Sequence, residues 1–251
     1  MSTDPKVGAS PGSDVVIAHA SDIHVGCDET TRVSGGDETL VLERTLAAAR
    51  AAACHVVLFA GDVFEHNRLP LALVGRAARL FADANLPVVI LPGNHDPAIE
   101  KSVWRMGPMA GVENVHVLGV THDEAVTFPE LDLEIWGHAH QGYEDMAPLR
   151  QPRQRSTRWQ IAMAHGHYEP KPDRAKPLQP AWLIGDDDIN ATGADYVALG
   201  HWNRAVSVGN AKIPAYYSGS PSLAHSINVI RLTAAGEVRV GQQPVAWDQP
   251  E

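Results

Sequence analysis

Three short apolar runs, each followed by a cluster of polar residues, constrain the fold of this chain more than any other feature. The runs VVIAHA, HVVLFA and PVVILP occupy residues 15–20, 55–60 and 87–92. Their length and β-branched content predict buried strands. The stretches between them predict helices, because residues 40–53 are rich in alanine and residues 69–84 have a proline in the first turn.

This order of elements indicates parallel strands joined by right-handed crossovers. In open sheets of this kind, ligands bind beyond the carboxyl ends of the strands. The polar clusters SDIH, GDVFEHN and GNHD directly follow the three strands, so we expect them to lie close together. Beyond residue 110 the helical signal fades, and strand candidates such as LDLEIWG, WQIAMAHG and DYVALGHW predict a second layer of mixed or antiparallel sheet.

Length and composition fit one large α/β domain, which we place at residues 15–242 of the 251. We expect a flexible tail at 1–14, a C-terminal tail at 243–251, and a surface excursion at 145–180, which is rich in Pro and Arg. A net charge of −10 excludes a chain held to nucleic acid by bulk electrostatics alone. Two cysteines and no signal-peptide or membrane-spanning pattern predict a cytoplasmic protein that does not bind membranes.

The 13 histidines are the most informative residue count, because several stand beside Asp, Asn and Gly where strands are expected to end. Two cations held side by side need about eight protein ligands, one of them a carboxylate that both share. The candidates at strand ends are Asp22, His24, Asp62, Asn94, His95, His165 and His201. His167, two residues after His165, is the alternative to it at that strand end.

Five blocks of sequence, DIH, GDVFEHN, GNHD, AHG and GHWN, resemble in this order the calcineurin-like metallophosphoesterases. The resemblance covers about residues 15–235, and YVALGHW followed by YYSGSP is most similar to the double-strand-break repair nuclease branch of that family. It implies a four-layer α/β/β/α sandwich of two mixed sheets, with a dinuclear metal site at the strand ends.

The same resemblance implies a role for each matched residue. The first metal would be held by Asp22, His24 and Asp62. Asp62 would bridge to a second metal, held also by Asn94, His165 and His201. His95 would face the substrate phosphate without binding a metal, and Asp96 would orient it.

The last block departs from the family pattern at one ligand. Where the pattern Gly-His-x-His has its second histidine, this chain has Asn203. An amide oxygen is a weaker donor than imidazole to a transition metal, so the occupancy of the first site depends on this position. The motif GHAH, with His138 and His140, is an alternative source of ligands, although it precedes the AHG block and so stands in the wrong order.

Two further features could contact the substrate. Trp202 stands between His201 and Asn203 and could stack on a base or sugar, although core packing is equally open to it. Arg155 belongs to the basic part of the excursion, which could guide a phosphate chain towards the metals or could be plain solvated surface.

These features predict a metal-dependent phosphodiester hydrolase that uses a metal-bridging hydroxide, a DNA exonuclease or endonuclease being one form of it. His95 would donate a hydrogen bond or a proton. Two divalent cations are expected, Mn by resemblance, while mixed N and O ligands also admit Fe or Zn. The alternatives are a small-molecule phosphodiesterase or phosphomonoesterase, and a metal-binding scaffold whose turnover is weakened at Asn203. An ATPase partner is implied by the resemblance alone.

Overall fold

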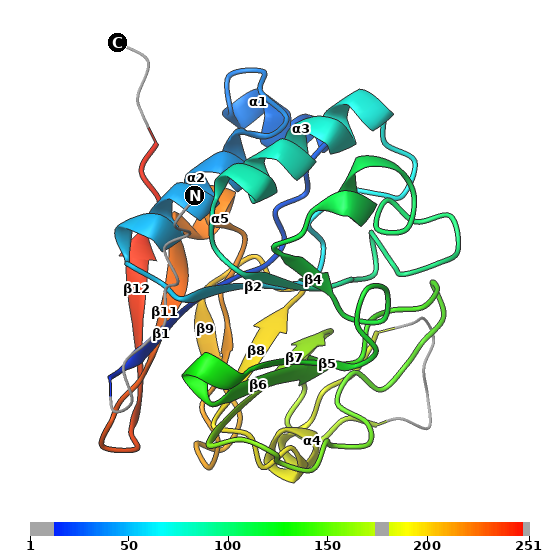
Figure 1. Ribbon diagram of the computed structural model, residues 1–251. Coiled ribbons are helices and arrows are strands. Elements are labelled where there is room, and N and C mark those ends of the chain that lie inside the picture. The colour runs from blue at the N-terminus through cyan, green and yellow to red at the C-terminus, as the bar shows by residue number, and fades with distance from the viewer. Residues whose placement is uncertain (1–12, 174–180, 248–251) are drawn as a thin grey trace.

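The computed structural model describes residues 13–173 and 181–247 of the chain. Two six-stranded sheets lie face to face, with α1, α2 and α3 on the outer side of one and α4 on the outer side of the other (Figure 1). Each sheet contains both parallel and antiparallel pairs. The predicted α/β/β/α sandwich of two mixed sheets is therefore confirmed.

The first sheet is built on the three strands expected at the start of the chain. Its order is β12-β11-β1-β2-β3-β4, where the strands are β1 (Val15–Ala20), β2 (Val56–Ala60), β3 (Val88–Leu91), β4 (Val115–Val117), β11 (Ser226–Leu232) and β12 (Val238–Pro244). Strands β1 to β4 run parallel, whereas β11 and β12 are antiparallel additions beside β1. The covering helices are α1 (Asp28–Val33), α2 (Leu40–Ala51) and α3 (Leu71–Asp83), and α2 and α3 lie within two residues of their expected bounds.

The second sheet comes from the later part of the chain. Its order is β5-β6-β7-β8-β10-β9, where the strands are β5 (Ala125–Phe128), β6 (Leu133–Gly137), β7 (Trp159–His165), β8 (Tyr196–Gly200), β9 (Val206–Val208) and β10 (Ala215–Tyr217). Strands β6, β7, β8 and β10 run parallel. Short helices complete the fold at η1 (Gly107–Gly111), η2 (Pro129–Leu131), α4 (Asp186–Ala191) and α5 (Pro221–Ala224).

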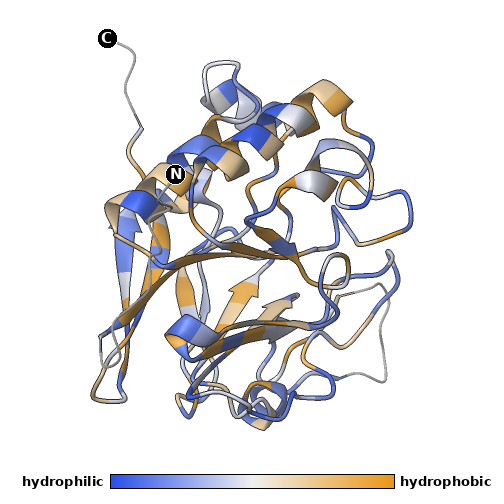
Figure 2. Ribbon diagram, viewed as in Figure 1, coloured by the Kyte–Doolittle hydropathy of each residue, from blue (hydrophilic) through white to orange (hydrophobic). Residues whose placement is uncertain are grey.

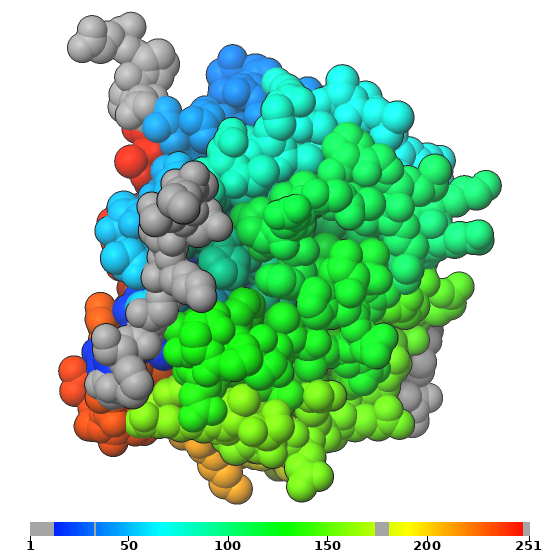
Figure 3. Space-filling model, viewed as in Figure 1, coloured from blue at the N-terminus to red at the C-terminus, as the bar shows by residue number. Residues whose placement is uncertain are grey.

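Successive residues of the central strands alternate between two apolar layers. In β1, Val16 and Ala18 pack towards the helices, whereas Val15 and Ile17 pack between the sheets. Because both faces are buried, these strands are continuous apolar runs (Figure 2). A third layer, which includes Ile189 of α4, lies under the second sheet. The cyan and green segments of the chain form one continuous surface on the face seen in Figure 3.

The two sheets are also joined by hydrogen bonds of a buried histidine in β1. His19 Nε2 donates to the carbonyl of Leu199 at 3.2 Å, and the Tyr196 hydroxyl lies 3.0 Å from His19 Nδ1. Because His19 precedes Asp22 by three residues and Leu199 precedes His201 by two, these bonds set the carboxyl ends of β1 and β8 beside one another.

The chain ends differ in part from the expected boundaries. Strand β12 continues to Pro244, beyond the boundary at residue 242. Asp14 accepts a hydrogen bond from Ala234 N, while residues 1–12 of the expected tail and 174–180 of the expected excursion lie outside the described residues. Within the described residues, no helix combines the length and apolar character needed to cross a membrane.

Candidate metal centre

The predicted ligands follow the strands in a strained backbone. Asp22, His24 and Asp62 have φ between 54° and 56°, and His201 has φ of 107°. Residues other than glycine rarely adopt such angles, and these strained conformations persist only where the surrounding structure holds the backbone in place. Here the two loops hold each other, because Asp22 N donates to Gly61 O and His24 N donates to Asp62 O, both at 3.1 Å.

Two glycines allow the candidate ligands to approach the backbone. A Cβ atom on Gly61 would collide with the ring of His165, and one on Gly93 would collide with the carboxylate of Asp62. Any larger residue at either position would displace a candidate ligand. The glycines that begin the GDVFEHN and GNHD blocks are therefore explained by the close approach of these two side chains to the backbone.

Three of the candidates form one group of metal-type donors. One ligand atom each of Asp22, His24 and Asp62 lies within 4.8 Å of the others. The two carboxylates are buried, and His24 Nε2 lies 4.0 Å from Asp22 Oδ1. His24 Nδ1 donates to the Glu65 carboxylate at 2.8 Å, so its Nε2 lone pair is directed to the cluster, the arrangement usual for a metal-binding histidine.

The second group adjoins the first through Asp62. His165 Nδ1 donates to the carbonyl of Ala60 at 2.8 Å, which leaves Nε2 facing the cluster. That nitrogen lies 3.1 Å from Asp62 Oδ2 and 2.9 Å from Asn94 Oδ1. Asp62 is thus the carboxylate within reach of donors from both groups.

The buried carboxylates of the cluster stabilise positive charge beside them, as two pKa shifts show. Burial opposes the charged form of His165, but the carboxylates of Asp62 and Asp22 outweigh it and raise the pKa of His165 to about 9. Burial also opposes ionisation of Asp62, yet the charge of His165 holds the pKa of Asp62 well below its usual range. The proton on His165 Nε2 therefore lies between Asp62 Oδ2 and Asn94 Oδ1, in a position that also favours a metal cation. Carboxylate, imidazole and amide donors in this arrangement fit a divalent transition metal.

His95 lies at the rim of the cluster, where it contacts Glu65. The backbone N–H of His95 donates to Asp62 Oδ1 at 2.9 Å, and its Nδ1 donates to the Glu65 carbonyl at 3.0 Å. The rings of His24 and His95 meet edge to face, 4.8 Å apart. Our sequence reasoning missed Glu65, although its place three residues after Asp62 in the same block was a usable signal.

Asp96 has a different set of contacts from the one implied for it. Its carboxylate accepts hydrogen bonds from the backbone N–H groups of Gly93 and Phe64, at 2.8 and 3.0 Å. Burial, together with the charge of Asp62, raises the pKa of Asp96 to about 6. Among the described residues, the His95 ring is oriented by the hydrogen bond that it donates to the Glu65 carbonyl, and not by one to Asp96. Asp96 instead joins the GNHD turn to the GDVFEHN loop.

The last block contributes one residue to the cluster in this structure. His201 N donates to Asp22 Oδ2 at 3.0 Å, and its ring centre lies 5.3 Å from that of His165. Burial, and then the charge of His165, lowers the pKa of His201 to about 4, which keeps the imidazole neutral. Asn203 is exposed, and within the described part of the chain it has no hydrogen bond to the cluster.

Trp202 is held by the protein itself. Its ring stacks on buried Tyr217 with centres 4.5 Å apart, and the guanidinium of Arg204 lies over it at 5.0 Å. Its Nε1 donates to His167 Nδ1 at 3.0 Å. A base could stack on Trp202 only by competing with these neighbours.

Arg155 is not brought to the cluster. Its guanidinium donates to the Asp195 carboxylate at 2.6 Å and to the Gly193 carbonyl at 2.8 Å, both just before β8 begins. The predicted ligands follow the opposite, carboxyl ends of the strands. Arg153 and Arg158 are bound in the same region, to Glu134 and to the carbonyl of Ala234.

The GHAH motif also has its own partners. His138 lies 2.9 Å from Glu124 Oε1 and donates to the Arg150 carbonyl, whereas His140 Nε2 donates to the carbonyl of His165 at 2.9 Å. His140 thus supports the backbone of a candidate ligand. Among the residues that the structure describes, its buried Nδ1 has no hydrogen-bond partner.

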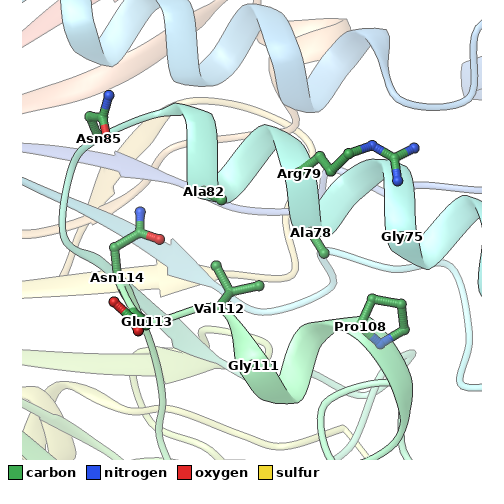
Figure 4. A pocket seen from close by; sticks show the side chains of 10 residues that line it. All are labelled: Gly75, Ala78, Arg79, Ala82, Asn85, Pro108, Gly111, Val112, Glu113 and Asn114. Carbon is green, nitrogen blue, oxygen red and sulfur yellow. The ribbon is translucent and has the colours of Figure 1, made fainter.

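Two hollows on the surface differ in their relation to the cluster. A groove between α3 and η1, with Arg79 and Glu113 at its walls, contains none of the predicted site residues (Figure 4). A cavity of about 510 Å³ is lined by Asn94 and His95 together with His66, Arg68 and Tyr143, three residues that sequence reasoning did not select. The second hollow is therefore the one that adjoins the candidate centre.

Two mixed sheets with a buried carboxylate and imidazole cluster at their strand ends define a metallophosphoesterase-like α/β protein. A model of the calcineurin-like phosphoesterase family matches residues 15–204, and the chain belongs to this family. Candidate metal-binding groups of the kind that this family uses are present in the structure.

The chain is similar to several known proteins at low sequence identity. It is 24% identical over 260 residues to the SbcD subunit of the nuclease SbcCD of Bacillus subtilis (strain 168), a match that takes in 84% of this chain. The chain spans only 62% of the length of that relative. The crystal structure of TT1561 of Thermus thermophilus is 12% identical with a TM-score of 0.56, over 93% of this chain and all of that one. A Staphylococcus aureus structure described as a candidate 5'-nucleotidase is 13% identical with a TM-score of 0.58, over 94% of this chain and 55% of that one. These structures support the fold alone.

Proposed function

We propose that this protein is a dinuclear metal-dependent hydrolase of phosphodiesters, with a nucleic acid strand as its substrate. The observation that carries the proposal is the position of the Asp62 carboxylate, which reaches donors of two adjoining groups. The similarity to a nuclease subunit supports the substrate class.

The ligands we propose are those expected from the sequence. The first metal would be held by Asp22, His24 and Asp62, with Asn203 completing its set, and the second by Asp62, Asn94, His165 and His201. When bound, two divalent cations, Mn by resemblance, would supply an activated water and neutralise charge on the phosphate.

His95 would act on the leaving group. Its Nδ1 donates to the Glu65 carbonyl, so Nε2 is free to carry the proton that the leaving oxygen needs. The water would lose a proton to solvent as its oxygen bonds to phosphorus, the bond from phosphorus to the leaving oxygen would break, and that oxygen would take the proton from His95 Nε2. Asp96 would fix the turn that carries His95, through its two backbone hydrogen bonds.

A small-molecule phosphodiesterase is the second candidate, and one observation favours it. Arg153, Arg155 and Arg158, three of the four described arginines of the excursion expected to guide a phosphate chain, are bound to the protein's own groups. An ATPase partner belongs to the nuclease proposal and rests on sequence resemblance, whereas the proposed cytoplasmic location rests on the low cysteine count.

The test is a substrate panel in added Mn with metal analysis of the purified protein. We expect hydrolysis of bis(p-nitrophenyl) phosphate and single-stranded DNA, and little of p-nitrophenyl phosphate. The His95→Gln variant should retain both metals and lose about 100- to 10,000-fold in turnover. Preferred cleavage of the monoester, or loss of metal from His95→Gln, would refute the assignment.

A further inference from the structure

The cavity beside the candidate centre has two anchored walls. Asn94 and His95 form its inner side, the loop Glu65–Arg68 forms one wall, and Tyr143 lies in another. Its volume of about 510 Å³ is within the range of about 300–1,000 Å³ usual for ligand pockets.

The wall that carries Arg68 is fixed from behind. The Asn67 amide donates to the carbonyl of Pro97 at 2.9 Å and accepts from Val103 N at 3.0 Å. Arg68 N donates to His66 Nδ1 at 3.1 Å. The Arg68 side chain is exposed, and in the ranges the structure describes its guanidinium makes no ion pair. An arginine on an anchored loop therefore stands at the cavity wall with its donors available.

The wall that carries Tyr143 is also anchored. The carbonyl of Glu144 accepts a hydrogen bond from Trp182 Nε1 at 3.0 Å, and Asp145 Oδ1 accepts from the backbone N–H groups of Ala181 and Trp182. Tyr143 itself is 55% exposed, so its ring is accessible to a ligand in the cavity. An aromatic ring of this kind offers a surface for a base.

The place of His95 decides which part of a substrate enters the cavity. Under the proposed function, on which this inference rests, His95 gives its proton to the leaving oxygen. Because His95 lines the cavity, the leaving group must lie in it. We propose that the cavity binds the nucleotide on the leaving-group side of the scissile bond, with its base against Tyr143 and its far phosphate on Arg68.

This assignment names the substrate class as an oligonucleotide or polynucleotide. A simple monoester, or a diester with a single phosphate, has no group for Arg68 to bind. The cavity would thus provide recognition in a protein whose net charge of −10 provides no general attraction for nucleic acid.

The experiment compares two thymidine dinucleotides, TpT with its single phosphate and pTpTp with a phosphate at each end. We expect Arg68→Ala to lower the ratio of kcat/KM for pTpTp over TpT by about 10- to 100-fold. Arg79→Ala, which removes another exposed arginine from the groove of Figure 4, is the matched control and should leave the ratio unchanged. An unchanged ratio in Arg68→Ala would overturn the phosphate assignment.

Binding of pTpTp to the metal-free protein, measured by calorimetry, provides a readout that needs no turnover. Tyr143→Ala should weaken it by about 10-fold or more, whereas Tyr143→Phe, which keeps the ring, should bind as the native protein does. Equal affinity in Tyr143→Ala would overturn the base assignment. If no diester is hydrolysed but these binding losses occur, the proposed function fails and the cavity assignment stands as a nucleotide site.

Discussion

A single buried histidine should make the stability of this protein depend on pH. His19 is fully buried in β1, where burial lowers its pKa from 6.5 to about 3, only partly opposed by its hydrogen bond to the Leu199 carbonyl. In the unfolded chain the same imidazole is exposed and binds a proton near pH 6.5. Between these two values the unfolded state holds a proton that the folded state does not, so stability falls as the pH drops below 6.5 and continues to fall towards pH 3.

The magnitude follows from the width of that window. Each pH unit within it costs about 1.4 kcal/mol of the free energy of unfolding. Lowering the pH from 7 to 5 crosses about 1.5 units of the window, so His19 alone should remove about 2 kcal/mol. Such a loss is a large fraction of the stability of an ordinary domain.

The measurement is urea unfolding followed by tryptophan fluorescence at pH 7, 6 and 5, with EDTA in every sample so that metal linkage does not differ between proteins. His19→Gln can still bridge Tyr196 and Leu199, and its loss of stability from pH 7 to 5 should be smaller than the native loss by about 2 kcal/mol. Tyr196→Phe is the control. It removes the hydroxyl but leaves His19 buried, so it should cost about 1 kcal/mol at each pH and keep the native pH dependence. Equal pH dependence in His19→Gln and the native protein would refute the reasoning.

Three further predictions concern the candidate ligands and the arginine region. Asp62→Ala should lose both metals together in elemental analysis, because this carboxylate reaches both donor groups, and one metal retained at full stoichiometry would assign it to a single site. Asn203→His should lower the Mn concentration for half-maximal activity by about 10-fold; superimposable titrations would mean that residue 203 never reaches the metal. Arg153→Ala should cost about 1 kcal/mol in urea unfolding, because the buried Glu134 carboxylate loses one of its donors, and should not change the salt dependence of oligonucleotide binding. A flattened salt dependence with unchanged stability would show that Arg153 meets phosphate.

Much of the fold was predictable because both faces of the central strands are buried. Runs such as VVLFA in β2 lack the polar alternation of a strand with one solvent-exposed face, so they indicate a strand buried on both faces. The alanine-rich segment between two such runs is readily predicted as a helix, and it forms α2. The second half of the chain was harder. Strands such as β9 and β10 are three residues long, and their pairing depends on partners far along the chain, which periodicity does not reveal.

The predicted site residues at strand ends came together in the structure, whereas Arg155, on a loop, did not join them. Asp22, Asp62 and His165 stand directly at strand ends, so the direction of the strand places them, and the structure brings them together. Their roles as ligands stay predictions. Arg155 lies on a loop, and a long side chain of this kind finds whichever acceptor the fold brings near. That acceptor, Asp195, is 40 residues away in the sequence and could not be foreseen.

The same reasoning explains why the basic excursion suggested a function that its contacts do not support. A cluster of arginines in an acidic chain has two ways to lower its energy: it can bind a polyanion, or it can donate to carboxylates and carbonyls that the fold leaves without other donors. Glu134 is buried in β6, between β5 and β7, and needs donors, which Arg153, Ser156 and Gln160 supply. A buried carboxylate without them would be costly, so the folded chain uses its own arginine there. Recognition of phosphate is then left to a cation that has no such partner within the described residues, and Arg68 beside the candidate centre meets that condition.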